Sequence, residues 1–202
     1  MEIKPILFST PMVQAILDGR KTQTRRVIKP YPTGVFEQIS PGLCMDRHAS
    51  LNNTISIKSK YQIGDFLWVR ETWQRSEYTL NGFTYKAYAH SEKTGKWKPS
   101  IFMPKEAARI FLKVTNVRKE RLHDLSKDDA VKEGIEPIEV WNDKLVSDQN
   151  IFKNYLKDLR GPLSPRLSFF TLWESINGKE SLGNNPWVWV YDFERIERPI
   201  NI

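Results

Sequence analysis

The residues best suited to chemistry lie in one short segment, GRKTQTRR. From Arg20 to Lys29 the sequence carries five basic residues and no acidic one, and two threonines alternate with them. Cations beside hydroxyl groups suit the binding of a phosphate or of a carbonyl oxygen. We therefore interpret six residues of this segment as candidates for function: Arg20, Lys21, Thr22, Thr24, Arg25 and Arg26.

The conformation of the segment decides which side chains act together. In an extended chain, Thr22, Thr24 and Arg26 share one face, and Lys21 and Arg25 share the other. Because the segment directly follows a predicted helix, a bend there could still bring Lys21 and Thr24 together. The alternative is a solvated basic loop, since charged side chains are mostly exposed. The position of the cluster between a helix and a strand favours a binding site.

A second group of candidates lies at the exit of the predicted strand FLWVRETW, where Arg70, Glu71 and Trp73 follow one another closely. Glu71 could pair with a cation of the 20–29 segment or read a base edge, and Trp73 could stack on a base. Equally, Arg70 and Glu71 could form a structural ion pair while Trp73 packs in the core.

The loop KPSIFMPKEAAR supplies a third group. Pro99 and Pro104 make it stiff, and Ser100 and Met103 between them could line a cleft. Rigid loops on a scaffold often carry sites, which favours a role in binding. A loop shaped only for packing is the alternative.

Neither metal ligands nor paired cysteines are indicated. His48, His90 and His123 are scattered and lack metal-ligand spacing, so we expect no metal and no cofactor. Cys44 is the only cysteine, which excludes an intramolecular disulfide and agrees with a reducing compartment. Because Pro41 and Gly42 precede it, we place Cys44 in a loop and do not expect a nucleophile.

The elements that position these groups follow from periodicity and capping residues. Apolar runs and alternation predict strands over residues 3–8, 66–73, 83–89, 109–122 and 186–196. Helices are predicted to begin at Thr10, Ser126 and Ser164, and Phe152, Tyr155, Leu156 and Leu159 also have helical spacing. In the last strand, Trp187, Trp189, Tyr191 and Phe193 share one face and should form a wall of the core.

Two stretches, about 30–62 and 135–164, lack the pattern of the rest and are interpreted as insertions, the first as an irregular loop rich in Pro, Ser and Asn. With 202 residues, of which 40% are hydrophobic, the chain is expected to form one domain spanning residues 1–202. Short helices among five or six strands predict a mixed α+β fold around a small sheet or barrel.

Several segments in this order resemble the ASCH domain family, and in particular its longer phage and prophage members. The resemblance rests on GRKTQTRR after a short helix, GDFLWVRETW, KPSIFMPKEAARI, DLSKDDAVKEGI and LWESINGK…NPWVWVYDFERI, which together span about residues 4–196. Only the two insertions match poorly. The resemblance implies a PUA-like β-barrel with short flanking helices and a cleft for RNA or a nucleoside.

The resemblance also implies a mechanism. A small bacterial branch of the family hydrolyses N4-acetylcytidine with a lysine, a threonine and a glutamate. The lysine and the threonine match Lys21 and Thr24, and the glutamate near a helix end matches Glu133. A buried lysine can lose its proton near neutral pH and accept the proton of a threonine that attacks an amide carbonyl. A carboxylic acid can then protonate the leaving amine, and Thr22 or a backbone N–H could hold the oxyanion.

Other functions remain open from the sequence. A net charge of +7 fits a polyanionic partner, so a non-catalytic RNA- or DNA-binding module is one alternative. A metal-independent ribonuclease using the same cleft is another, and a phage assembly or host-interaction protein is a further one. No run predicts a transmembrane helix and the N-terminus lacks a signal-peptide pattern, so we expect a cytoplasmic protein without a membrane partner.

Overall fold

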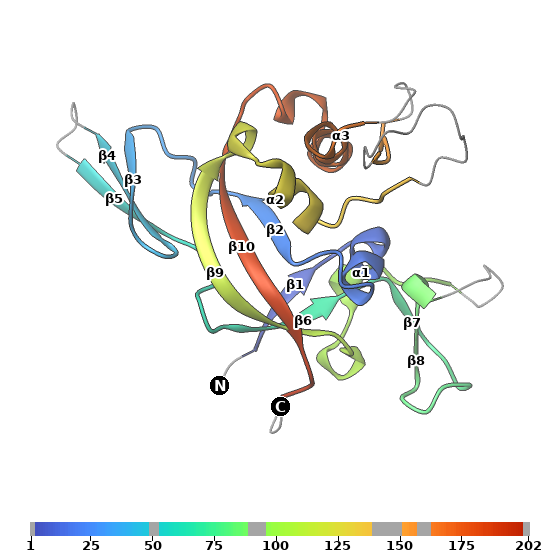
Figure 1. The fold of residues 1–202 in the computed structure, drawn as a ribbon. Helices are drawn as coiled ribbons and strands as arrows, with labels where there is room; N and C mark the ends of the chain where they lie inside the picture. The colour runs from blue at the N-terminus through green and yellow to red at the C-terminus, as the bar shows by residue number, and fades with distance from the viewer. Residues whose placement is uncertain (1–2, 49–52, 89–95, 139–150, 157–162, 200–202) are drawn as a thin grey trace, which may run out of the picture.

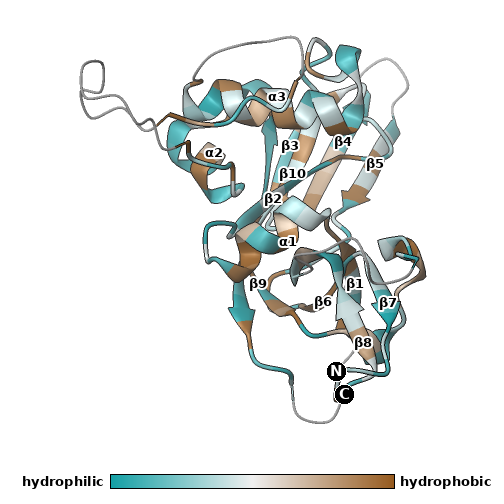
Figure 2. Ribbon diagram, turned by 90° about the vertical axis from the view of Figure 1, so that its right-hand side faces the viewer, coloured by the Kyte–Doolittle hydropathy of each residue, from teal (hydrophilic) through white to brown (hydrophobic). Residues whose placement is uncertain are grey.

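The computed structural model describes residues 3–48, 53–88, 96–138, 151–156 and 163–199. These residues form a five-stranded sheet, a three-stranded sheet, a small hairpin and three α-helices (Figure 1). The mixed α+β class predicted from the sequence is confirmed. The helices α2 (Lys127–Lys132) and α3 (Pro165–Asn177) lie together at one end, and the two termini lie close to each other at the opposite end (Figures 1 and 2).

The five-stranded sheet has the order β1-β6-β9-β10-β2. Its strands are β1 (Ile3–Leu7), β6 (Phe66–Arg70), β9 (Phe111–Arg121), β10 (Trp187–Ile196) and β2 (Gln23–Val27), and only β1 and β6 pair in parallel. The edge strands β1 and β2 share no backbone pairing in the described part of the chain, so the predicted closed barrel is not seen. Arg26 bridges them through its side chain, donating from Nη2 to the Leu7 carbonyl at 2.8 Å.

Strand β10 is buried on both of its faces. Trp189, Tyr191 and Phe193 point into the main core, with Trp187 packed against it, as the alternation predicts. Val188 and Val190 point the other way and pack with residues of α3 in a second cluster. The sheet is therefore a middle layer between the main core and the α2–α3 layer, which agrees with the run of large apolar residues in β10.

Residues 30–62 are not an irregular loop, which corrects the prediction. They contain the antiparallel strands β3 (Val35–Ser40), β4 (Leu43–His48) and β5 (Asn53–Lys58). A turn at Pro41-Gly42 joins the first two, and Gly42 has φ of +74°, which only glycine adopts readily. The alternation is weak because this sheet buries few side chains, chiefly Phe36, Cys44 and Ile57.

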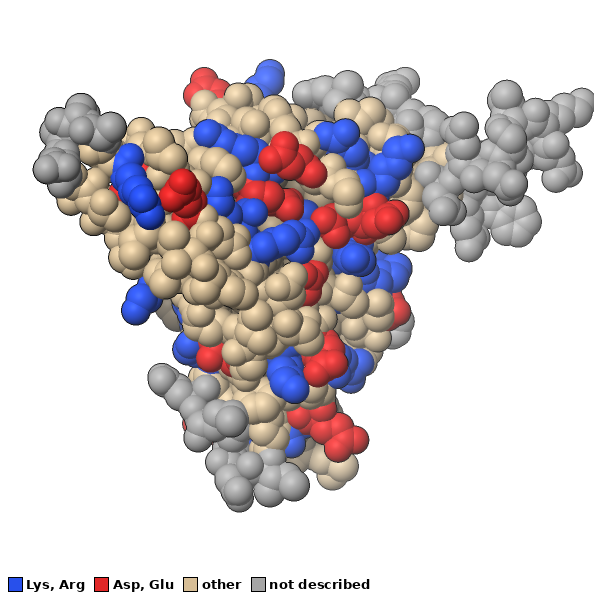
Figure 3. All heavy atoms as spheres, turned by 60° about the vertical axis from the view of Figure 1, so that its left-hand side comes forward, with Lys and Arg blue, Asp and Glu red and all other residues tan. Residues whose placement is uncertain are grey.

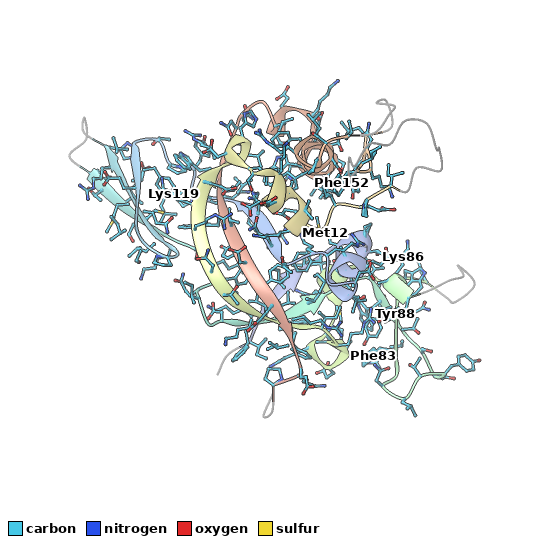
Figure 4. All side chains as sticks on the ribbon, in the orientation of Figure 1. Met12, Phe83, Lys86, Tyr88, Lys119 and Phe152 are labelled. Carbon is cyan, nitrogen blue, oxygen red and sulfur yellow. The ribbon has the colours of Figure 1, made fainter. Side chains whose placement is uncertain are left out.

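The three-stranded sheet is attached to the main sheet through Phe36. The Phe36 ring meets Trp187 edge-on at 5.3 Å between centroids. Lys119 of β9, labelled in Figure 4, donates to the Phe36 carbonyl at 2.8 Å and lies 4.0 Å from the Trp187 ring. The contact combines an aromatic pair with a cation over a ring, both favourable when partly desolvated.

Smaller differences concern segment ends. The strand predicted over 83–89 is shortened to β8 (Phe83–Tyr85), which pairs with β7 (Trp73–Arg75) and is followed by a 3-10 turn. The helix suggested by Phe152 and Tyr155 is wrong in its described part, 151–156, where Phe152 forms isolated bridges with Pro137 and Leu163. The helical spacing there reflects burial of Phe152 beneath α3 rather than a helix.

The three predicted helix starts are confirmed to within a residue. Helix α1 (Thr10–Leu17) is preceded by Ser9 and carries Pro11 in its first turn. Ser126 caps α2, its hydroxyl accepting from the Asp129 N–H, and Ser164 precedes α3. The apolar face of α3 is only partly buried, since Phe169 and Trp173 are covered but Ile176 is 53% exposed. No helix of the described residues is long and apolar enough to cross a membrane.

Truncation of the anchoring aromatic should weaken attachment of the three-stranded sheet. Phe36→Ala removes a buried ring and should lower the free energy of unfolding by about 3–5 kcal/mol, measured by urea denaturation. Burial raises the pKa of the Cys44 thiol to about 11, against the opposing charge of Lys119. Native Cys44 should therefore react slowly with iodoacetamide at pH 8, and Phe36→Ala should speed that reaction.

Val35→Ala is the matched control, because Val35 precedes Phe36 on the same strand and is 60% exposed. It should change the stability by no more than about 0.5 kcal/mol. Equal labelling rates for Cys44 in the two variants would contradict the anchoring role of Phe36.

Candidate functional site

The GRKTQTRR segment leaves α1, bends at Gly19 and enters β2, and at this bend it contacts the end of α2. Lys21 and Glu133 form an isolated antiparallel bridge, and the Thr22 N–H donates to the Lys132 carbonyl at 2.9 Å. Segments that lie 112 residues apart in the sequence are thereby joined through their backbones. This contact brings Lys21 together with Glu133, the glutamate named only through the family resemblance.

The Lys21 ammonium is completely enclosed. Its Nζ donates to Glu133 Oε2 at 2.8 Å, to the Glu133 carbonyl at 2.8 Å and to the Gln23 carbonyl at 2.9 Å. Its side chain has no exposed surface, and that of Glu133 is 4% exposed. Burial lowers the pKa of Lys21, and the neighbouring Glu133 carboxylate opposes that shift. The two charged groups are thus held together almost fully out of contact with water.

Arg25 holds the other oxygen of the same carboxylate. Its Nη1 donates to Glu133 Oε1 at 2.9 Å and its Nε to Glu120 at 2.8 Å, and its side chain is fully buried. The Arg25 guanidinium also lies 5.7 Å from the ring of Phe169 on α3. Lys21 and Arg25 therefore share the face of β2 that the alternation predicts, and Arg25 is directed inward toward acids.

The buried pair continues into a larger ionic network. Arg118 binds Asp129 at 2.7 Å, Asp192 at 3.1 Å and Glu120 at 3.3 Å. Gln23 donates to Asp192 at 2.6 Å and to Asp129 at 3.2 Å. Hydrogen bonds from Gln23 and the nearby guanidinium groups lower the pKa of Asp129 despite its partial burial, which acts in the opposite direction.

Thr24 lines a cavity of about 260 Å³ together with Glu133 and Arg25 of this network. The far wall comes from α3 through Phe169, Leu172 and Trp173. In the described residues the Thr24 hydroxyl makes no side-chain hydrogen bond, and Thr24 is 2% exposed. A volume of this size, near the lower end for ligand pockets, holds one small group such as a base.

Trp173 adds an unsatisfied donor to the cavity wall. Its indole Nε1–H is buried and has no hydrogen-bond acceptor among the described residues. A buried donor without a partner costs about 1–3 kcal/mol, so such groups in a native structure point to a missing acceptor. The nitrogen itself has under 1 Å² of accessible surface, so a ligand carbonyl would reach it only if the cavity wall shifts.

A second cavity of about 360 Å³ adjoins the first, because Met12, Glu133 and Leu172 line both. Tyr88 and Tyr155 line this second cavity, with Arg20. Met12 on α1 and Tyr88 are labelled in Figure 4 and lie on the α1 side, across from α3. Glu133 is thus accessible from both hollows, with α1 on one side and α3 on the other.

The residues predicted at the exit of β6 form a separate cluster. Glu71 is buried and pairs with Arg109 through two hydrogen bonds of 2.8 Å, rather than with the 20–29 segment or with Arg70. Arg70 donates to the Ile101 carbonyl. Trp73 is buried and packs on Phe83. The cluster lies near the second cavity at Arg109, whose guanidinium lies 4.3 Å from the centroid of the Tyr88 ring.

The loop candidates also lie in this cluster. Met103 is 1% exposed and its Sδ accepts from the Glu71 N–H. Ser100 begins a 3-10 turn and is partly exposed. Neither residue lines either of the two cavities beside Glu133, so the contacts of these two residues match the packing alternative.

The structure also identifies residues that the sequence did not single out. These are Phe169 and Trp173 on α3 and the acidic residues Glu120, Asp129 and Asp192, none of which the sequence assigns to a site. The three acidic residues share one signal, an acidic side chain in a strand or helix that can lie opposite the basic segment. On the face shown in Figure 3, basic and acidic groups are mixed, so the excess positive charge does not form one patch there. Among the described residues, no cluster of His, Cys, Asp and Glu could hold a metal ion.

The chain was compared with protein-family models, curated proteins and solved structures, and nothing matches in any of the three. The family resemblance therefore stays a hypothesis, and the chemistry has to be argued from the geometry.

The approach of α2 to the Lys21 segment depends on a glycine. Gly134 has φ of +80°, and a Cβ there would lie 2.6 Å from Lys21 Cβ and 2.8 Å from Ala15 Cβ. Gly134→Ala should lower the free energy of unfolding by about 2–5 kcal/mol, because left-handed strain of about 1–2 kcal/mol adds to overpacking of about 1–3 kcal/mol. Thermal or urea denaturation measures the loss.

Gly19→Ala is the control, because Gly19 has a similar φ of +75° but open space around its Cβ position. Its free energy of unfolding should fall only by the cost of the left-handed conformation, about 1–2 kcal/mol. Similar losses in the two variants would show that the close approach at Gly134 carries no energetic weight.

Proposed function

We propose that the chain is an ASCH-type protein with a PUA-like fold that hydrolyses the acyl amide of a modified pyrimidine nucleoside such as N4-acetylcytidine. One observation carries the proposal: Thr24 and Glu133 line the same small cavity, and Lys21 is hydrogen-bonded to Glu133 directly behind it. The five-stranded sheet with short flanking helices, and the position of GRKTQTRR between α1 and β2, are compatible with the family.

The reaction needs a base and an acid, and Glu133 of the buried pair can supply both. The Glu133 carboxylate, which lines the cavity with Thr24, accepts the Thr24 hydroxyl proton as the Thr24 Oγ attacks the acyl carbonyl. The resulting carboxylic acid protonates the leaving amine, and cytidine departs. The Glu133 carboxylate is thereby restored beside the Lys21 ammonium, with the acyl group on Thr24. Water hydrolyses that ester and frees the carboxylic acid.

A second candidate function is a non-catalytic binding module for a nucleoside or nucleic acid. It is favoured by the saturation of the Lys21 ammonium, whose three protons already have three acceptors. A buried ion pair of this kind can fix two segments without taking part in chemistry. In this case the same cavity holds a base, and the network serves only to shape it.

Removal of the hydroxyl tests the hydrolase. Purified protein is incubated with N4-acetylcytidine, and cytidine release is followed by chromatography. Thr24→Val keeps the shape of the side chain but removes the nucleophile, so it should reduce kcat at least about a hundredfold. Thr24→Ser should keep measurable activity.

Thr115→Val on the exposed side of β9 is the control for a Thr-to-Val change in a strand, and it should keep wild-type turnover. Absence of turnover in the wild-type protein, or full activity in Thr24→Val, would reject the hydrolase. Calorimetric binding of cytidine without hydrolysis of the acetylated form would support the non-catalytic module.

Trp173 offers a test of where the ligand sits. Trp173→Phe removes the unpaired indole N–H and keeps most of the ring. A ligand carbonyl that accepts from this group should then bind about three- to tenfold more weakly, seen in KM for hydrolysis or in Kd for cytidine. Trp68→Phe, in a separate cluster near Ile3 and Phe111, should leave both constants unchanged. Unaltered binding in Trp173→Phe would place the ligand elsewhere.

A further inference from the structure

A third hollow, of about 410 Å³, lies beside the end of β2 and differs from the others in its charge. It is lined by four basic residues and no acidic one, namely Arg26, Lys29, Lys58 and Lys60. Within the described residues none of the four has a carboxylate partner. Four cations around one concave surface repel one another, and an anion in the hollow would relieve that repulsion.

The apolar part of this hollow is partly aromatic and rigid. Tyr61, Trp189 and Tyr191, which are nearly completely buried, line it together with the aliphatic residues Ile6, Leu7 and Val27. The Ser59 hydroxyl donates to the Tyr61 carbonyl, and the Tyr61 hydroxyl donates to the Pro5 carbonyl at 2.8 Å. These bonds fix the backbone of the turn that carries Lys60, so the position of this lysine at the hollow is well defined.

The hollow is built by both sheets. Arg26 and Lys29 come from β2 and its end, whereas Lys58 ends β5 and Lys60 follows it. The segment 30–62, interpreted from the sequence as an insertion, thus supplies half of the cations. Its role here is to bring two lysines opposite Arg26.

The basic hollow and the Thr24 cavity lie next to each other. Arg26, Val27 and Lys29 line both. Strand β2 is an edge of the five-stranded sheet, so no further strand of that sheet covers the rim between them. A ligand can therefore occupy the cavity beside Thr24 and continue over the β2 edge into the basic hollow.

We infer that the hollow formed by Arg26, Lys29, Lys58 and Lys60 binds the phosphate groups of a single-stranded nucleic acid whose modified base enters the Thr24 cavity. The inference rests on the proposed function for the identity of the base, and it adds that the substrate is a nucleotide within a strand rather than a free nucleoside. Phosphates meet the cations, and the neighbouring sugar and base reach the cavity across the β2 edge.

Binding of a fluorescein-labelled eight-residue oligocytidylate, followed by anisotropy over a range of salt concentrations, tests the inference without requiring catalysis. The double variant Lys58→Gln/Lys60→Gln should bind at least about tenfold more weakly at low salt. Its plot of log affinity against log salt should be less steep by about 0.7 for each phosphate that the variant no longer neutralises. The substituted side chains are exposed, and an unchanged melting temperature should confirm that the variant is folded.

Lys105→Gln/Lys179→Gln is the charge-matched control, since both lysines are exposed and line none of the three cavities. It should bind the oligocytidylate like the wild type. Equal affinity and equal salt dependence in the two double variants would overturn the inference, as would absence of binding in the wild type. Pyrophosphate that binds as tightly as the oligocytidylate would also overturn it, by showing a site for small free phosphates.

The two proposals fail separately. Oligocytidylate binding that depends on Lys58 and Lys60, with no hydrolysis of N4-acetylcytidine alone or within an oligonucleotide, would retain the phosphate site and reject the hydrolase. Hydrolysis of the free nucleoside, together with oligocytidylate binding that does not depend on Lys58 and Lys60, would retain the hydrolase and reject the phosphate site.

Discussion

Burial of the Lys21 ammonium places the strongest constraint on this structure. A fully enclosed cation is tolerated only when its protons are accepted by nearby oxygens, and here Glu133 supplies two of the three acceptors. Arg25 binds the second carboxylate oxygen from the same strand. Removal of one partner from such a set typically costs about 3–5 kcal/mol, so the end of α2 cannot move away from β2 without a large loss of stability.

The position of α2 in turn decides where the hollows lie. With α2 held against the start of β2, Glu133 stands between α1 and α3 and lines the cavities on both sides. The close approach requires a residue without a side chain at position 134, next to Lys21 and Ala15. The polar network and the packing at Gly134 thus act together. The network requires the end of α2 to lie close to Lys21, and the missing side chain at position 134 permits that close approach.

Strand β10 and strand β2 have contrasting roles in the same sheet. The former is covered on both faces and carries the apolar residues of two clusters. The latter is an edge strand whose inner face holds the ion pairs, while Thr24 and Arg26 line hollows at its rim. An edge strand has a neighbouring strand on one side only, and two ligand-sized hollows lie along β2. Segment 30–62 forms one wall of the basic hollow and adds two lysines to it.

The sequence by itself determined the elements with strong local signals, and it made Lys21 and Thr24 candidates; Glu133 was named only through the family resemblance. Capping serines, prolines in first helical turns and apolar alternation predicted α1, α2, α3, β9 and β10, since these signals act within a few residues. The strands of 35–58 were missed, because a small sheet that buries few residues leaves little alternation. The pairing of Lys21 with Glu133, the pairing of Glu71 with Arg109 and the basic hollow beside Arg26 were decided by the tertiary structure alone. Each joins groups far apart in the chain, and whether a charge is buried and paired or free to bind an anion depends on which distant segment lies against it.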